Sequence, residues 1–282
     1  MKKKIVIGLA QFGLSYGVTN KLKHVRKKQF SKVINFAQKN NIKFLHTSKY
    51  YGNANDLIQK KKINSFTIYL KYKPEDILNI KNIDSFNLKK IFDSKSIILM
   101  LDGFENLNND MASKVYQLIF YLKKKNFIKK FGYSVYSFKN LKKICKIFRP
   151  DIVQFPYNIL DRRLEKNNLI SYLKTKKIEI HVRSIFLQGV LLQKISELPK
   201  YFLKWKKILN KFNNQMNKCN VSNLEGCINF VLRNKYIDKV LIGVDHVDQL
   251  KQILEVKKNK KIIFPQFVIK NQELINPSKW KN

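Results

Sequence analysis

The chain has 282 residues, enough for one barrel domain of ~250 residues and too few for two ordinary large domains. Hydrophobic residues make up 44% of it, which permits a packed core, and the apolar run Ile97–Leu101 is far shorter than the ~20 residues that span a bilayer. The 57 Lys and Arg against 19 Asp and Glu give a net charge of +38, but these cations are scattered in short runs that form no recognised nucleic-acid module. We therefore expect a solvated basic surface, with no specific nucleic-acid partner and no membrane span.

Short apolar segments recur along the chain and alternate with segments whose apolar residues repeat every three or four positions. Continuous apolar runs are typical of parallel strands buried on both faces. In chain order the predicted strands are Ile5–Gly8, Ile42–Leu45, Phe66–Leu70, Ile97–Leu101, Phe131–Val135, Asp151–Phe155, Ile178–Val182 and Val240–Val244. The alternation predicts an α/β fold, a (β/α)8 barrel in a single domain over residues 1–282. An extra helical or loop insertion is expected at about 185–220, with a helix around Leu198–Phe212.

The start of the chain and its cysteines bear on the compartment. Met1–Ala10 contains only a short apolar stretch, and we interpret it as the first strand and not as a signal peptide. The three cysteines have neither C-x-x-C spacing nor a His at metal-ligand spacing. We therefore predict a reduced, cytoplasmic protein without a metal site.

Polar residues gather where the predicted strands end, which is where the active site of such a barrel lies. They are His46 to Tyr51 after the second strand, Lys71 after the third, Asp102 after the fourth, Ser134 and Gln154 in the fifth and sixth, Arg183 and Ser184 after the seventh, and Gly243 in the eighth. His181 lies two residues before Arg183 and is expected to be an interior histidine with satisfied hydrogen bonds.

Four segments in the same order resemble motifs of the aldo-keto reductase family. Phe44–Asn53 resembles the family's D-T-A-x-x-Y-G signature, with His46 in the Asp position. Gly8–Gly17 resembles the family's opening strand and loop, and Asp151–Asn158 resembles its sixth strand. Ile242–Val244, followed by Gln249-Leu250, resembles its last strand and helix. The similarity runs from about Ile5 to Leu254, so the chain resembles a divergent member of the family.

This resemblance implies that a small-molecule carbonyl (an aldehyde, ketone or sugar) and an alcohol are interconverted by hydride transfer with NADP(H) or NAD(H). Tyr51 holds the position of the tyrosine that donates the proton, and Lys71 that of the lysine that assists it. A free phenol has a pKa near ~10, so it needs a neighbouring cation to titrate near neutral pH.

Two catalytic positions depart from the family pattern. The family has an Asp that pairs with the lysine and a His at the end of strand four, but here these positions are His46 and Asp102. A neutral imidazole would not anchor Lys71, and a carboxylate would repel a developing oxyanion. Strands three and four are ~4.8 Å apart as neighbours, so Asp102 can pair with Lys71 while His46 approaches the substrate oxygen. The alternative is drift after loss of activity.

The resemblance also implies a cofactor-binding set, although it carries over less well. Arg183 stands where many members place an aromatic residue on the nicotinamide, and an arginine can stack there too or bind an anionic substrate. The basic cluster for the adenosine 2′-phosphate is poorly matched, since Asp245 and His246 follow the last strand. The choice between NADP and NAD therefore stays open. The predicted set is Ser134, Gln154, Arg183, Ser184 and Gly243.

Other classes of function remain as alternatives. The first is a catalytically silent barrel that binds nicotinamide cofactor or a ligand as a sensor or assembly partner. The second is a lyase or isomerase that uses His46, Asp102 and Lys71 as acid–base groups without nicotinamide. A polyanion-binding role would rest on charge alone.

Overall fold

The structure is a computed structural model that describes residues 1–19, 27–61, 63–80, 94, 96–267, 269 and 271–280. Its strands form a closed barrel in which every neighbouring pair is parallel and β8 closes on β1. The strands are β1 (Ile5–Gly8), β2 (Phe44–Ser48), β3 (Thr67–Tyr72), β4 (Ser96–Asp102), β5 (Lys130–Ser134), β6 (Ile152–Pro156), β7 (Glu179–Arg183) and β8 (Lys239–Gly243). The predicted (β/α)8 barrel is confirmed, and each predicted strand overlaps an observed one.

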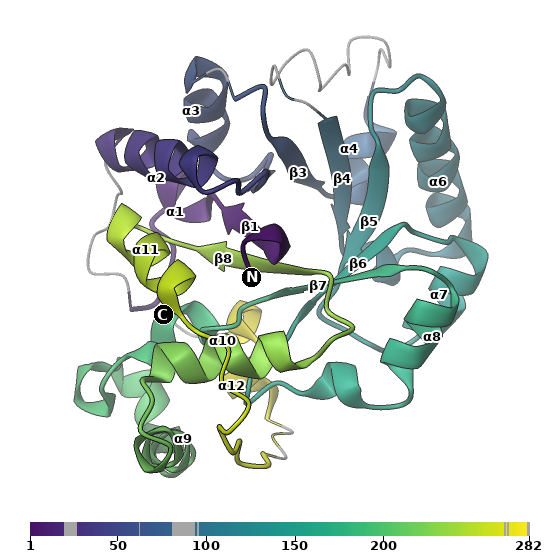
Figure 1. The fold of residues 1–282 in the computed structure, drawn as a ribbon. Helices are drawn as coiled ribbons and strands as arrows, with labels where there is room; N and C mark the ends of the chain where they lie inside the picture. Colours follow the sequence, from purple (N-terminus) through teal and green to yellow (C-terminus); the bar gives the residue numbers. More distant parts are fainter. Residues whose placement is uncertain are drawn as a thin grey trace.

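Helices surround the strands on the outside of the barrel (Figure 1). They are α1 (Ala10–Gly13), α2 (Lys27–Lys39), α3 (Ala54–Lys61), α4 (Pro74–Leu78), α6 (Asn109–Lys124), α7 (Leu141–Ile147), α8 (Leu169–Thr175), α9 (Lys206–Lys218), α10 (Asn223–Arg233), α11 (Val247–Glu255) and α12 (Gln272–Ile275). Helix α6 shows why they form: Val115, Ile119 and Leu122 recur with the helical period and are fully buried. No helix in the described part of the chain has both the length and the apolar character needed to cross a membrane.

Strand β2 ends three residues later than predicted. The sequence predicts Ile42–Leu45, but the strand runs on through His46, Thr47 and Ser48, which pair with Tyr69, Leu70 and Lys71 of β3. All three residues are buried although they are polar. Polarity at the end of a strand is therefore a poor guide here, because this part of the strand faces the mouth of the barrel and not solvent.

The connection from β7 to β8 carries several short helical segments. The helix expected around Leu198–Phe212 begins only at Lys206, after a 3-10 segment over Lys200–Trp205. Tyr201 and Trp205 stack edge to face with ring centroids 5.3 Å apart, and Phe202 packs beside them. This aromatic cluster fixes the 3-10 turn, so the regular helix starts beyond it.

Apolar side chains fill much of the barrel interior. Val6, Tyr69, Ile98, Met100 and Ile152 form a small cluster of their own inside the ring of strands. The ring of His181 packs edge-on against Tyr69, and its Nε2 lies 3.0 Å from Glu179 Oε2. His181 is thus a buried histidine with a partner, as expected, and does not line the cavity described next.

Candidate active site

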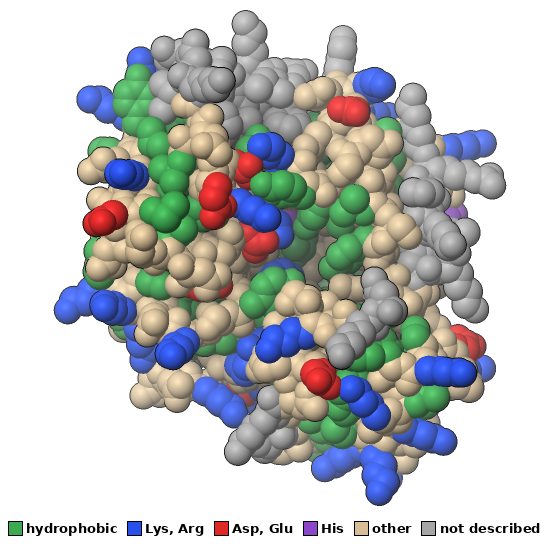
Figure 2. Space-filling model, turned by 180° about the vertical axis from the view of Figure 1, so that it is seen from behind, with side chains coloured by type: hydrophobic (Ala, Val, Ile, Leu, Met, Phe, Trp, Pro, Cys, Tyr) green, Lys and Arg blue, Asp and Glu red, His purple; other side chains and the backbone are tan. Residues whose placement is uncertain are grey.

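A cavity of about 770 Å³ opens at the carboxyl ends of the strands. Seen from the side opposite to Figure 1, the molecule is hollowed near its centre, and charged side chains of both signs stand beside the hollow (Figure 2). The predicted residues that line the cavity are His46, Tyr51, Lys71, Gln154, Arg183, Ser184 and Gly243. Of the described residues predicted for the site, Asp102 and Ser134 are not part of this lining; they face each other across β4 and β5.

Tyr51 is held by a tight contact between two loops. Its amide donates to Ser48 O (3.2 Å), and its carbonyl accepts from Ala54 N (3.0 Å) at the start of α3. A Cβ on Gly13 would lie 1.9 Å from Tyr51 O, so only glycine permits this approach. Burial raises the pKa of the phenol above its ordinary value, and the charge of Arg183 opposes part of this rise. The phenol is therefore protonated at neutral pH and available as a proton donor.

Lys71 forms an ion pair with Asp102 in the wall of the site. Its Nζ lies 2.9 Å from Asp102 Oδ2, and 5.9 Å from the centroid of the Tyr51 ring. Lys71 pairs with Met100 in the β3–β4 register, so Asp102, two residues further along β4, stands on the same face. Burial alone would raise the pKa of Asp102, but the Lys71 ammonium outweighs it and holds that pKa below its usual value. The ion pair between Lys71 and Asp102, which the adjacency of β3 and β4 permits, is therefore present.

His46 is buried at the floor of the cavity with nothing bonded to its ring. Only 1% of the residue is exposed, and neither ring nitrogen has a hydrogen-bond partner. Burial, followed by the charges of Lys71 and Arg183, lowers its pKa to about 3, so the imidazole is neutral. The centroids of the His46 and Tyr51 rings are 6.2 Å apart. A neutral imidazole beside a phenol can donate one hydrogen bond to a ligand oxygen in the cavity.

Two tyrosines that the sequence interpretation did not single out also line the cavity. Tyr16 follows β1, and Tyr136 follows β5. The Arg183 guanidinium lies over the Tyr136 ring, with Cζ 3.9 Å from the centroid, and its Nη2 donates to Val135 O (3.1 Å). A signal for both was available in principle, since Tyr16 falls in the Gly8–Gly17 segment and Tyr136 directly follows the fifth predicted strand.

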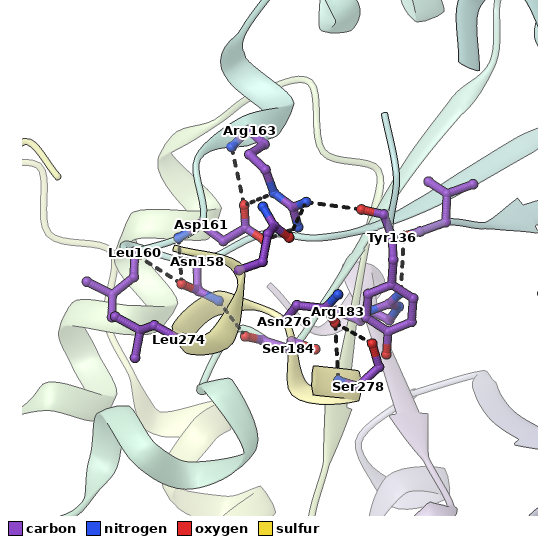
Figure 3. Close-up of polar contacts among 12 residues, drawn as sticks. Tyr136, Asn158, Leu160, Asp161, Arg163, Arg183, Ser184, Leu274, Asn276 and Ser278 are labelled. Carbon is purple, nitrogen blue, oxygen red and sulfur yellow. Dashed lines mark hydrogen bonds and ion pairs between the residues drawn. The ribbon is translucent and has the colours of Figure 1, made fainter. Parts of the chain in front are cut away.

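The ion pair of Asp161 with Arg163 contacts the backbone of Tyr136 and so supports this stack (Figure 3). Asp161 is fully buried and accepts from Arg163 Nε and Nη2, both at 2.8 Å. The remaining Nη1 of Arg163 donates to Tyr136 O (3.1 Å). On the other side, Asn158 Nδ2 donates to Ser184 O (3.0 Å), which fixes the residue after Arg183. The loops after β5, β6 and β7 are thus tied together around Arg183.

The far part of the cavity is built from the loop after β7 and the start of two helices. Ser184, Leu187, Gln188 and Gly189 have left-handed backbone angles, with φ between 50° and 93°. Thr19 Oγ1 donates to Gln188 O (3.1 Å), which joins this loop to the loop after β1. The lining continues through residues 222–224 at the start of α10 and 245–246 before α11.

The residues present fit a nicotinamide cofactor. Gln154 is 2% exposed, lines the cavity and has an Oε1 without a hydrogen-bond partner, as suits an acceptor for a carboxamide. Helix starts such as those of α10 and α11 favour phosphate groups. The cavity volume lies within the range typical of cofactor sites.

Comparisons with known proteins agree with this arrangement. The model of the Aldo/keto reductase family matches residues 4–262. The structure is similar to AKR11C1, an aldo-keto reductase from Bacillus halodurans in its holo form, with TM-score 0.70, 15% identity, and coverage of 91% of this chain and 88% of that one. It is also similar to PA4992 from Pseudomonas aeruginosa, a provisionally assigned aldo-keto reductase, with TM-score 0.63, 12% identity, and coverage of 90% and 89%. No curated protein matches the chain.

Proposed function

The chain belongs to the aldo/keto reductase family, and from this we propose that it interconverts a carbonyl (an aldehyde, ketone or sugar) and an alcohol with NADP(H) or NAD(H). The observation that carries the proposal is the convergence of a protonated phenol, a paired lysine and a neutral imidazole at one cavity. Tyr51, Lys71 and His46 all line it. The structurally similar AKR11C1 was solved in a holo form.

Four polar groups have separate roles around the substrate oxygen. Tyr51 donates its proton to the nascent alkoxide, since burial keeps it protonated. Asp102 holds Lys71 in place by the 2.9 Å ion pair, so that the ammonium stays near the phenol. His46, neutral and without a partner, donates a hydrogen bond that orients the carbonyl.

The predicted cofactor residues would hold the nicotinamide end and the adjoining groups. When bound, the cofactor supplies the hydride. Gln154 would accept from the carboxamide through its free Oε1, with Ser134 beside it on β5 and Arg183 two residues beyond its β7 partner His181. Ser184 and Gly243 line the same cavity, and Gln11 lies close against Gly243, where a Cβ would be 2.1 Å from Gln11 Nε2.

The test compares the protein with Tyr51→Phe, using oxidation of NADPH and of NADH with a panel of small aldehydes, ketones and sugars. We expect the variant to lose about 10²–10⁴-fold in kcat, since it keeps the ring and loses only the proton donor. Cofactor affinity, measured by calorimetry, should not change. Because the pKa of Tyr51 is raised, reduction should persist as the pH rises to about 10, with no alkaline loss from this group.

Three outcomes bear on the alternatives. Equal and negligible rates for both proteins, together with tight cofactor binding, would replace the proposal by a silent barrel that binds cofactor. An absence of cofactor binding would refute it altogether. Turnover that needs no redox partner would favour the lyase or isomerase.

A further inference from the structure

Arg183 carries a buried positive charge for which the described residues provide no ion-pair partner. The residue is 9% exposed, and among the described residues no carboxylate forms an ion pair with it. The nearest acid of the catalytic group, Asp102, is already paired with Lys71 at 2.9 Å. His46 is neutral, so the set of Lys71, Asp102 and Arg183 keeps one net positive charge. Burying such a charge is costly unless an anion joins it.

The guanidinium also has hydrogen-bonding capacity to spare. Its Nη2 donates to Val135 O, but Nη1 is buried and makes no hydrogen bond. Its Cζ lies 3.9 Å from the centroid of the Tyr136 ring, and Arg163 Nη1 donates to the Tyr136 carbonyl at 3.1 Å (Figure 3). A guanidinium held in this way cannot easily turn to solvent for its missing partner, whereas a planar fork of donors matches a carboxylate.

The position of Arg183 favours the substrate over the cofactor phosphates as the source of that anion. Its charge is the largest influence that opposes the raised pKa of Tyr51, so the guanidinium stands near the proton donor. The part of the cavity suited to phosphates lies elsewhere, at the helix starts of 222–224 and 245–246. An anion on Arg183 would therefore be a few bonds from the reacting carbonyl.

We infer that Arg183 is the carboxylate anchor of the substrate site, and that the preferred substrate is a carbonyl compound bearing a carboxylate, such as an oxo acid or an oxidised sugar acid. The reduction of such a substrate rests on the proposed function, but the binding of its carboxylate to Arg183 does not. The single surplus charge matches one monoanionic carboxylate. Arg183 thus sets specificity, while Tyr51 performs the proton transfer.

The first experiment measures kcat/KM for two matched pairs: 2-oxobutanoate against its methyl ester, and 4-carboxybenzaldehyde against its methyl ester. We expect the acid of each pair to be preferred by about 10- to 100-fold, the range for a charge-assisted contact. Arg183→Gln should abolish the preference, and Arg183→Lys should keep part of it. As a matched control, Lys73→Gln removes one exposed cation outside the cavity lining and should leave the preference unchanged.

The second experiment needs no turnover, so that it separates this inference from the proposed reaction. Calorimetry compares the binding of benzoate and benzamide to the protein, with and without saturating cofactor. Selective binding of benzoate that Arg183→Gln removes would support the anchor even if no carbonyl were reduced. Equal rates for acid and ester in the unaltered protein would overturn it. So would an Arg183→Gln variant that weakens NADPH and NADH binding while leaving the acid preference intact.

Discussion

Lys71 takes its carboxylate from β4 and not from β2. The 2.9 Å contact with Asp102 and the free imidazole of His46 are two parts of one exchange, since the resemblance places the Asp on β2 and the His on β4. Lys71 lies between the two strands in the barrel, so either neighbour can supply its counter-ion. The exchange keeps one aspartate and one histidine at the site but places each of them on the other strand.

This exchange predicts strong coupling between the two positions. His46→Asp alone would place a second carboxylate near Lys71, and Asp102→His alone would remove the carboxylate that forms an ion pair with Lys71. We expect each single variant to lower kcat/KM by about 10- to 100-fold, and the double variant to recover to within about fivefold of the original. Measured with one carbonyl substrate, this is a double-mutant cycle. Effects that simply multiply would show that the two residues act independently.

At the scale of elements, the position of Tyr51 depends on how closely α1 approaches the loop after β2. A Cβ on Gly13 would meet Tyr51 O at 1.9 Å and Ala54 N at 2.7 Å, both of them backbone atoms that cannot move aside alone. Gly52, with φ +48°, faces Gly13 from the other side. The two glycines therefore set the height of the phenol in the cavity.

Gly13→Ala should consequently impair both stability and catalysis. We expect a loss of about 1–3 kcal/mol in the free energy of unfolding, from crowding, and at least about a tenfold loss in kcat/KM, because a displaced phenol no longer reaches the substrate oxygen. Urea unfolding and steady-state kinetics provide the two measurements. Gly226→Ala is the control for crowding without catalytic loss, since the atoms nearest to its Cβ belong to the buried side chain of Met216 (Sδ at 2.1 Å) on α9 and not to the loop of Tyr51. Full activity in Gly13→Ala would refute this account of the loop.

The strands could be predicted from the sequence because their apolar runs are buried on both faces, as in Ile97–Leu101 of β4. The end of β2 could not, since His46 and Ser48 are polar yet buried. Of the nine residues predicted for the site from their place at strand ends, seven line the cavity. The stack of Arg183 on Tyr136 was not predicted, because it joins residues far apart in the chain through loops that carry no periodic signal.

At the scale of the whole molecule, the net charge of +38 means that the Lys and Arg side chains repel one another, and individual ion pairs do not cancel this repulsion. Lys and Arg side chains are distributed around the outline of the face in Figure 2, and many of them have no acidic neighbour there. Repulsion among surface charges acts over about 10 Å at 0.1 M salt. The folded state, being compact, experiences it more strongly than the unfolded chain.

Salt should therefore stabilise the fold. We expect Tm to rise by a few degrees as NaCl increases from roughly 20 to about 200 mM, the range over which screening shortens the reach of these charges. Scanning calorimetry at neutral pH measures this. Near the isoelectric point of about 10.1 the same series should have a much smaller effect. A Tm that falls with salt at neutral pH would mean that the surface ion pairs outweigh the repulsion.

The place of Asp102 on β4 also has a consequence for how such proteins are recognised. A search that demands an acidic residue directly before the threonine–serine pair of β2 would discard this chain as defective. A search with a spatial template that accepts the counter-charge from either strand adjacent to the lysine would retain it. Sequences classed as degenerate barrels can be re-examined on that criterion, with the carboxylate sought on the strand after that of the lysine as well as on the strand before it.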